Sequence, residues 1–168
     1  FRVINFGEKS GVSIFIFRLH GVFGKWCRPN YNSVVATFCN NIACNLPINI
    51  SDPTKEIELV YIDDVNCAFL GLMDNIIPPS DGTYFMVKPA YRISLGSLAE
   101  KIQGFRDTRD SHALPEISEP FTHALYATYI SYLPTDSFAY SLTKKSDPRG
   151  ELAELLKSPQ IGQIFVSR

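Results

Sequence analysis

Long apolar runs and net charge are both scarce in the 168-residue sequence. No apolar run reaches the roughly 18 residues that a membrane-spanning helix needs, and the longest candidate, Val12 to Phe17, has the length of a strand. The formal net charge of −1 argues against a nucleic-acid-binding protein that depends on a large basic excess. The first residues do not show the basic, apolar and small-residue order of a signal peptide. We therefore expect a cytoplasmic protein with no membrane or nucleic-acid partner.

Several motifs of metal and nucleotide sites are also missing. The four cysteines form no Cys-x-x-Cys pair, and no histidine lies at metal-ligand spacing from them, so no metal site is predicted. Cys39 and Cys44 fall in an apolar helical pattern and are predicted to be buried thiols, as in a reducing compartment. The sequence contains no Gly-x-Gly-x-x-Gly, no P-loop and no Gly-x-Ser-x-Gly.

What is present is the composition and alternation of an α/β fold. Hydrophobic residues make up 45% of the chain and charged residues 20%, which is enough for a packed core. Helix-like and strand-like segments alternate along the first 140 residues. Strands are predicted at 12–17, 57–62 and 84–87, and irregular loops at 20–31, 78–82 and 107–120. Helices are predicted at 1–9, at 34–42 after a cap at Asn32 or Ser33, at 63–72 after Asp63, at 95–105 after Ser94, and at 121–133.

The pattern changes after Pro134. Turn residues at 147–150 precede two short strand-like runs at 152–156 and 161–166, which are typical of an all-β unit. We therefore place a domain boundary near residue 140, with residues 1–140 forming one domain and residues 141–168 the beginning of another.

The loop from Lys25 to Asn32 carries the clearest chemical signal. It follows a predicted strand, and ligands in α/β folds bind at the carboxyl ends of strands. Arg28 offers a fork of donors and Lys25 a point charge, and both suit a diphosphate. The alternative is a solvated loop without a ligand.

The same loop contains aromatic and amide side chains. Trp26 and Tyr31 can stack on a base or a sugar, and Asn30 and Asn32 can hydrogen-bond sugar hydroxyls. These side chains and the two cations together provide the groups that a nucleotide-sugar site needs. The alternative assigns Trp26 the structural role of fixing the loop.

Two further patterns favour structural roles. Asp63 and Asp64 are either an acid/base pair or negative charges at the positive end of a helix, and we favour the second interpretation. Tyr126, Tyr129 and Tyr132 recur every third residue, which indicates a packed helix face rather than an aromatic cage for a ligand.

Several stretches resemble one enzyme family. Residues 16–24 resemble the strand and loop that follow the catalytic helix of extended short-chain dehydrogenases/reductases, and residues 60–65 resemble that family's second signature. Residues 23–38 are more specific, because they are similar to bacterial capsular-polysaccharide enzymes that join such a reductase to a C-terminal cupin. Residues 125–134 and 147–163 resemble the same subfamily.

The resemblance implies a fold and an activity. It implies that residues 1–140 are the C-terminal, substrate-binding part of a Rossmann-type domain and that residues 141–168 are the first strands of a cupin-like domain. The family's reductase domain uses NADPH to reduce the 4-keto group of a UDP-2-acetamido-2,6-dideoxy-hexos-4-ulose on the way to N-acetyl-L-fucosamine of capsules. Its cupin, often zinc-bearing, epimerises the sugar at C3. A homodimer with a UDP-sugar substrate is expected.

The resemblance also implies roles for individual residues. It places Lys25, Trp26, Arg28, Asn30 and Asn32 in the nucleotide-sugar site. It places His20 near the nicotinamide end of the NADP cofactor.

Other positions depart from the family pattern. Gly21 stands where the first signature usually has Asn, and Ile57 stands where many relatives have Arg. Tyr140 and Lys144 have the Tyr-x-x-x-Lys spacing of the family's catalytic pair, but they lie outside any helical pattern and are rejected. We therefore expect the catalytic Tyr and Lys and the cofactor loop before Phe1, the metal ligands after Arg168, and no catalytic residue in this chain.

Alternative functions remain open at the level of sequence. The shared signatures also fit part of a nucleotide-sugar epimerase or 4,6-dehydratase. A different class is a non-catalytic module that binds sugar nucleotides or supports assembly with a partner. In the reductase interpretation, the chain is a processed or partial protein that is inactive by itself.

Overall fold

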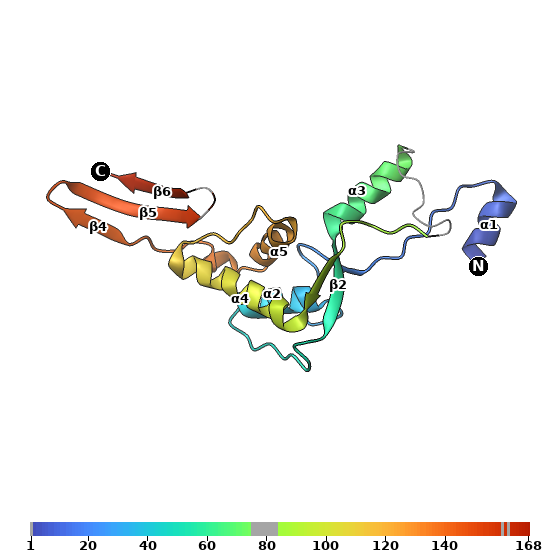
Figure 1. The fold of residues 1–168 in the computed structure, drawn as a ribbon, viewed down its shortest axis with the longest axis horizontal. Helices are drawn as coiled ribbons and strands as arrows, with labels where there is room; N and C mark the ends of the chain where they lie inside the picture. The colour runs from blue at the N-terminus through green and yellow to red at the C-terminus, as the bar shows by residue number, and fades with distance from the viewer. Residues whose placement is uncertain (1, 75–83, 159, 161) are drawn as a thin grey trace.

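The computed structural model describes residues 2–74, 84–158, 160 and 162–168, and it is elongated (Figure 1). Helix α1 lies at one end, the second of two sheets lies at the other, and the remaining helices lie between them. The helices are α1 (Arg2–Ser10), α2 (Val34–Ala43), α3 (Ile62–Met73), α4 (Leu95–Ser111), α5 (Pro120–Ile130) and the 3-10 helix η1 (Thr135–Ser137). The strands are β1 (Gly21–Phe23), β2 (Glu56–Tyr61), β3 (Tyr91–Ser94), β4 (Lys144–Asp147), β5 (Gly150–Ser158) and β6 (Gly162–Ser167). No helix in the described ranges is long and apolar enough to cross a membrane.

The first sheet has the strand order β1-β2-β3. Strand β1 runs parallel to β2, with Gly21 opposite Leu59, and β3 runs antiparallel to β2, with Ile57 opposite Ile93. Leu59 and Val60 in the central strand are buried, because neighbours cover both faces of β2. A mixed sheet beside helices confirms the predicted α/β class.

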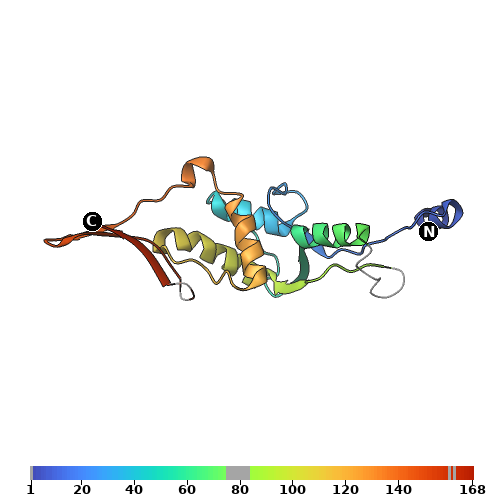
Figure 2. The same ribbon diagram turned by 90° about the horizontal axis from the view of Figure 1, so that it is seen from above.

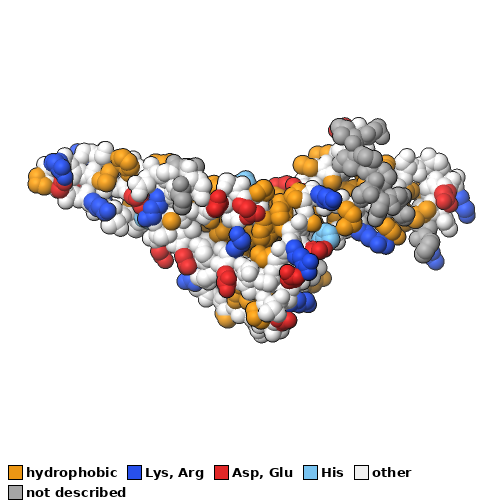
Figure 3. All heavy atoms as spheres, viewed as in Figure 1, with side chains coloured by type: hydrophobic (Ala, Val, Ile, Leu, Met, Phe, Trp, Pro, Cys, Tyr) orange, Lys and Arg blue, Asp and Glu red, His pale blue; other side chains and the backbone are white. Residues whose placement is uncertain are grey.

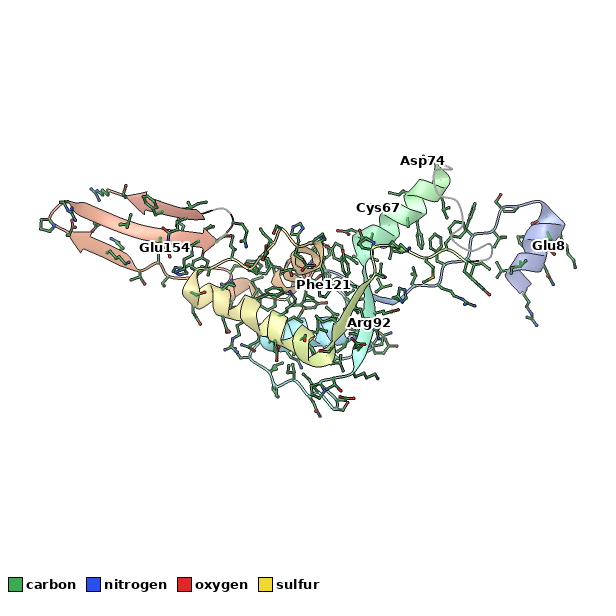
Figure 4. All side chains as sticks on the ribbon, in the orientation of Figure 1. Glu8, Cys67, Asp74, Arg92, Phe121 and Glu154 are labelled. Atoms are coloured by element: carbon green, nitrogen blue, oxygen red, sulfur yellow. The ribbon has the colours of Figure 1, made fainter. Side chains whose placement is uncertain are left out.

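The main core lies where α2, α4 and α5 meet this sheet. Leu98, Ile102 and Leu125 are fully buried there. Phe121, labelled in Figure 4, places its ring 5.8 Å from that of Phe23 and 4.9 Å from that of Tyr91. These contacts fix α5 against the first sheet. Strand β1 of that sheet leads directly into the predicted site loop.

Side-chain caps explain where three of the helices begin. Ser33 accepts a hydrogen bond from the Ala36 N–H, and Ser94 accepts one from the Ser97 N–H, as the sequence predicted. Glu119 caps α5 through the N–H groups of its first turn. The cap predicted at Asp63 is wrong. Helix α3 starts one residue earlier, at Ile62, because the extended backbone of Tyr61 ends β2, and the Asp63 carboxylate then lies within the positive first turn.

The strand predicted at 12–17 does not form. Phe17 makes a single bridge to Phe85, and Phe15 is 48% exposed. A ladder needs a continuous neighbour, and among the described residues this segment pairs only around Phe85. The strand predicted at 84–87 does not form either, and its residue Phe85 contributes to the same single bridge.

Other sequence predictions also need correction. The loop predicted at 20–31 contains β1, and the first residues of the loop predicted at 107–120 belong to α4, which continues to Ser111. Cys39 is buried as predicted, whereas Cys44 is exposed because it is the C-terminal cap of α2. The loop predicted at 78–82 lies outside the described residues.

Helix α3 buries less of its apolar stripe than the sequence predicted. Val65 is buried, but Phe69 is 45% exposed and Met73 is 78% exposed. Figure 3 shows hydrophobic side chains gathered on the surface beside this helix.

The second sheet has the order β4-β5-β6 and is antiparallel throughout. Strands β5 and β6 confirm the two predicted runs, and β4 begins at Lys144, so Tyr140 and Lys144 do not share a helix. The sheet extends away from the helices (Figure 2). It is joined to the end of α4 by Lys157, whose N–H donates to the His112 carbonyl at 2.8 Å. The domain boundary near residue 140 stays a prediction.

Candidate functional site

The loop at residues 24–32 lies at the carboxyl end of β1. Because β1 and β2 are parallel, the loop that follows β1 and the start of α3 that follows β2 meet at one edge of the sheet. The Lys25 Nζ lies 3.7 Å from Asp63 Oδ2 and 5.9 Å from the centre of the Tyr61 ring. A loop cation therefore faces the first turn of α3.

Its neighbours keep the Lys25 side chain positively charged. The pKa of Lys25 is raised, first by a side-chain hydrogen bond with Tyr61 and then by charge interactions that include the Asp63 carboxylate. Burial is the first cause that raises the pKa of Tyr61. At neutral pH the site therefore presents an ammonium group beside a neutral phenol.

The beginning of the loop is hydrogen-bonded to the end of α5. The Trp26 N–H donates to Ser131 Oγ at 3.4 Å, and the Tyr132 hydroxyl donates to the Cys27 carbonyl at 2.6 Å. Trp26 has a φ of +60°, a conformation that non-glycine residues seldom adopt. Contacts from a remote helix therefore hold an unusual backbone conformation at this position.

The end of the loop is hydrogen-bonded to α2. The Asn30 N–H donates to Thr37 Oγ1 at 2.9 Å, and the Asn30 side chain donates to Asn41 Oδ1 at 3.2 Å. Thr37 in turn donates to the Ser33 carbonyl at 2.8 Å. Asn30 has a φ of +53°, in the left-handed region that Asn tolerates better than most residues.

Several side chains of the fixed loop point to solvent. Trp26 is 80% exposed and Tyr31 is 73% exposed. The Arg28 guanidinium lies 5.3 Å from the centre of the Tyr31 ring, within cation–π range. Asn32 is also exposed. Exposed aromatic rings can stack on a flat ligand, and the cations beside them can pair with its negative charge.

The structure divides the predicted site residues into two places. Lys25, Trp26, Arg28, Asn30 and Asn32 share the loop at the carboxyl end of β1. His20 precedes β1, at its amino end, and its Nδ1 lies 2.9 Å from Glu58 Oε2. The structure therefore does not bring His20 together with the loop.

The residues present do not by themselves fit a dinucleotide or a metal. The sequence offers no glycine-rich phosphate loop, and His20 already has Glu58 as a partner. Within the described ranges, no three His, Cys, Asp or Glu side chains gather as a metal site. We therefore assign no reaction step to either group here.

Sequence reasoning missed the residues that hold the loop. Ser131 and Tyr132 lie about a hundred positions away in the chain, and only the fold brings them to Trp26 and Cys27. Tyr132 was predicted as part of a packed helix face; its ring does pack against the core, but α5 ends at Ile130, before this residue. Thr37 lies one turn after the Ser33 cap, which was the one local signal for its role.

The chain is similar to enzymes of capsule-sugar metabolism. It is 49% identical over 158 residues to UDP-2-acetamido-2,6-beta-L-arabino-hexul-4-ose reductase of Pseudomonas aeruginosa, a match that covers 94% of this chain and 42% of that protein. A crystal structure of the capsular polysaccharide assembling protein CapF from Staphylococcus aureus matches with a TM-score of 0.91 and 35% identity, over 99% of this chain and 45% of that one. No family model matches the sequence.

A more distant match concerns the fold alone. UDP-glucose 4-epimerase of Thermus thermophilus, solved with NAD, gives a TM-score of 0.58 at 15% identity over 78% of this chain and 50% of that one. The chain spans less than half the length of the CapF structure and of the curated reductase it matches. Over nearly its whole length, the chain belongs to the family of CapF-like UDP-sugar reductases.

Proposed function

We propose that this chain supplies the nucleotide-sugar-binding part of an NADPH-dependent reductase in capsular-polysaccharide biosynthesis. The proposed substrate is a UDP-2-acetamido-2,6-dideoxy-hexos-4-ulose, whose 4-keto group is reduced. Residues 1–140 are proposed as the C-terminal part of the Rossmann-type domain and residues 141–168 as the first strands of a cupin-like domain. The match to the Pseudomonas aeruginosa reductase supports the proposed substrate.

The single observation that carries the proposal is the held loop at the carboxyl end of β1. It presents Lys25 and Arg28 as cations and Trp26 and Tyr31 as exposed rings. We assign the two cations to the diphosphate and the two rings to the base or the sugar. Asn32 is available for a sugar hydroxyl, whereas the Asn30 amide already bonds to Asn41 and has a structural role.

Calorimetric titration of the chain with UDP, UDP-N-acetylglucosamine and GDP tests this proposal. We expect the uridine ligands to bind more tightly than GDP and the affinity to fall as salt is added. Lys25→Ala and Arg28→Ala should each raise Kd about tenfold, because a hydrogen bond to a charged group contributes about 1.5–3 kcal/mol. Trp26 is the single tryptophan, so its fluorescence gives a second signal for binding at the loop.

Lys55→Ala is the matched control, because Lys55 is an exposed lysine in the turn before β2 and outside the loop. It should leave the affinity unchanged. Equal losses in Lys25→Ala and Lys55→Ala would show that only net charge matters, and no binding of any uridine nucleotide at millimolar concentration would refute the proposal.

Catalysis is a separate part of the proposal. We expect the 168-residue chain alone to bind the sugar nucleotide without reducing it, since none of its residues is assigned to proton or hydride transfer. NADPH oxidation followed by absorbance with a 4-keto UDP-sugar measures this. Turnover by the isolated chain would show that its own residues complete the active site.

A further inference from the structure

The end of α5 holds the start of the site loop in place. Ser131 accepts a hydrogen bond from the Trp26 N–H, and the Tyr132 hydroxyl donates to the next carbonyl, that of Cys27. The two hydrogen bonds are made to consecutive residues, on opposite sides of the Trp26–Cys27 peptide. They therefore fix the direction in which this part of the loop leaves β1.

This support matters because Trp26 adopts an unfavourable conformation. Its φ of +60° lies in a region that bulky non-glycine residues seldom occupy because of steric strain. Trp26 is 80% exposed, so its own burial contributes little to offset that strain. Such conformations persist when the surrounding structure determines them, and here the contacts from Ser131 and Tyr132 do so.

Helix α5 is a rigid support for these two residues. Leu125, Thr128 and Tyr129 are at most 1% exposed. The last turn is closed by the N–H of Ser131, which donates to the Thr128 carbonyl at 3.1 Å, and by the N–H of Tyr132, which donates to the Tyr129 carbonyl at 3.0 Å. A support with little freedom of its own positions a loop at low entropic cost.

Protonation does not disturb the contact. Burial is the first cause that raises the pKa of Tyr132, to about 12. The hydroxyl therefore keeps its proton at neutral pH and donates to the Cys27 carbonyl.

We propose that Tyr132 is a positioning residue, which fixes the Trp26–Cys27 backbone through its hydroxyl and so sets the affinity of the loop for a UDP-sugar. Its partner in this role is Ser131. The proposal rests on the function proposed above. It assigns a residue just after the end of α5 to the control of a site about a hundred positions earlier in the chain.

Tyr132→Phe tests the proposal, because it keeps the ring in the core and removes only the hydroxyl. Tyr126→Phe is the matched control, since Tyr126 lies in α5, about two turns before Tyr132, and its ring packs on Phe105, away from the loop. We expect Tyr132→Phe to raise the Kd for UDP-N-acetylglucosamine about fivefold, as for one lost hydrogen bond, and Tyr126→Phe to leave it within twofold. The near-UV circular dichroism of Trp26 should change in Tyr132→Phe and not in Tyr126→Phe.

The outcomes separate this proposal from the proposed function. If the wild-type protein binds the UDP-sugar and Tyr132→Phe binds it equally well, the positioning role is overturned and the function stands. If the wild-type protein does not bind, the proposed function fails, and the Trp26 signal alone decides whether Tyr132 positions the loop. An unchanged Trp26 signal in Tyr132→Phe overturns the positioning role in either case.

Discussion

Replacement of Asp63 by Asn should strengthen nucleotide binding, because the Asp63 carboxylate competes with the ligand for Lys25. The Lys25 Nζ lies 3.7 Å from Asp63 Oδ2. A diphosphate that binds Lys25 has to replace this carboxylate and also approaches its negative charge. Asp63→Asn removes the competing charge and keeps nearly the same side-chain shape.

The size of the effect follows from the exposure of the pair. The Lys25 side chain is 34% exposed and that of Asp63 is 55% exposed. Coulomb's law gives about 1 kcal/mol for unit charges at this separation in water, and exposed pairs contribute about 0.2–1 kcal/mol when measured. Asp63→Asn should therefore lower the Kd for UDP about 1.5- to 5-fold.

The assay is a titration of wild-type and variant proteins with UDP at low salt and again at high salt. Asp64→Asn is the matched control, because it removes one negative charge from the same first turn of α3. The pKa of Asp64 is raised, first by burial and then by the charge of Asp63. The gain in affinity should be larger for Asp63→Asn than for Asp64→Asn, and added salt should reduce the difference.

Two results would contradict this reasoning. Weaker UDP binding in Asp63→Asn would mean that the carboxylate orients Lys25 for the ligand instead of competing for it. An equal gain in Asp64→Asn would mean that the general negative charge of the helix start matters and that the contact with Lys25 does not.

Four further substitutions test the scaffold, each by denaturant unfolding. Donors in the first turn of α5 outweigh burial and lower the pKa of Glu119 below its usual 4.5, so Glu119→Ala should cost about 1 kcal/mol at pH 7. The difference in unfolding free energy between the wild type and Glu119→Ala should shrink as the pH falls through the lowered pKa, because the protonated side chain no longer caps as a carboxylate. A difference that stays constant with pH would refute the capping role of the carboxylate. Leu98→Ala should cost about 2–5 kcal/mol, whereas Leu70→Ala, on the exposed side of α3, should cost under about 0.5 kcal/mol. Gly24→Ala should cost about 1–3 kcal/mol and weaken UDP binding, because the new Cβ would meet the side chain of Ile62; unchanged stability would show that the loop adjusts freely.

Local signals predicted the helices well and the strands less well. Ser33 and Ser94 are capping residues that act within their own first turn, so the starts of α2 and α4 could be predicted from adjacent residues. The apolar run from Val12 to Phe17 was predicted as a strand because its composition fits one. A strand depends on neighbours from elsewhere in the chain, and here the described residues pair with it only around Phe85.

The candidate site shows the same division. Residue types alone pointed to Lys25, Trp26 and Arg28, since their chemistry suits a nucleotide sugar. They could not show that Lys25 pairs with Asp63, because that contact depends on the parallel pairing of β1 with β2. The placement of His20 at the other end of β1 also follows from this pairing.

The sequence by itself determined the α/β alternation, the Ser33 and Ser94 caps, the chemistry of the loop and the resemblance to capsular UDP-sugar reductases. These features depend on residue types and on neighbours within one or two turns. Only the tertiary structure decided how the loop is held, because Ser131 and Tyr132 reach it across 105 positions of sequence. Contacts over that separation form only when α5 packs against the sheet, and packing of this kind depends on the whole core.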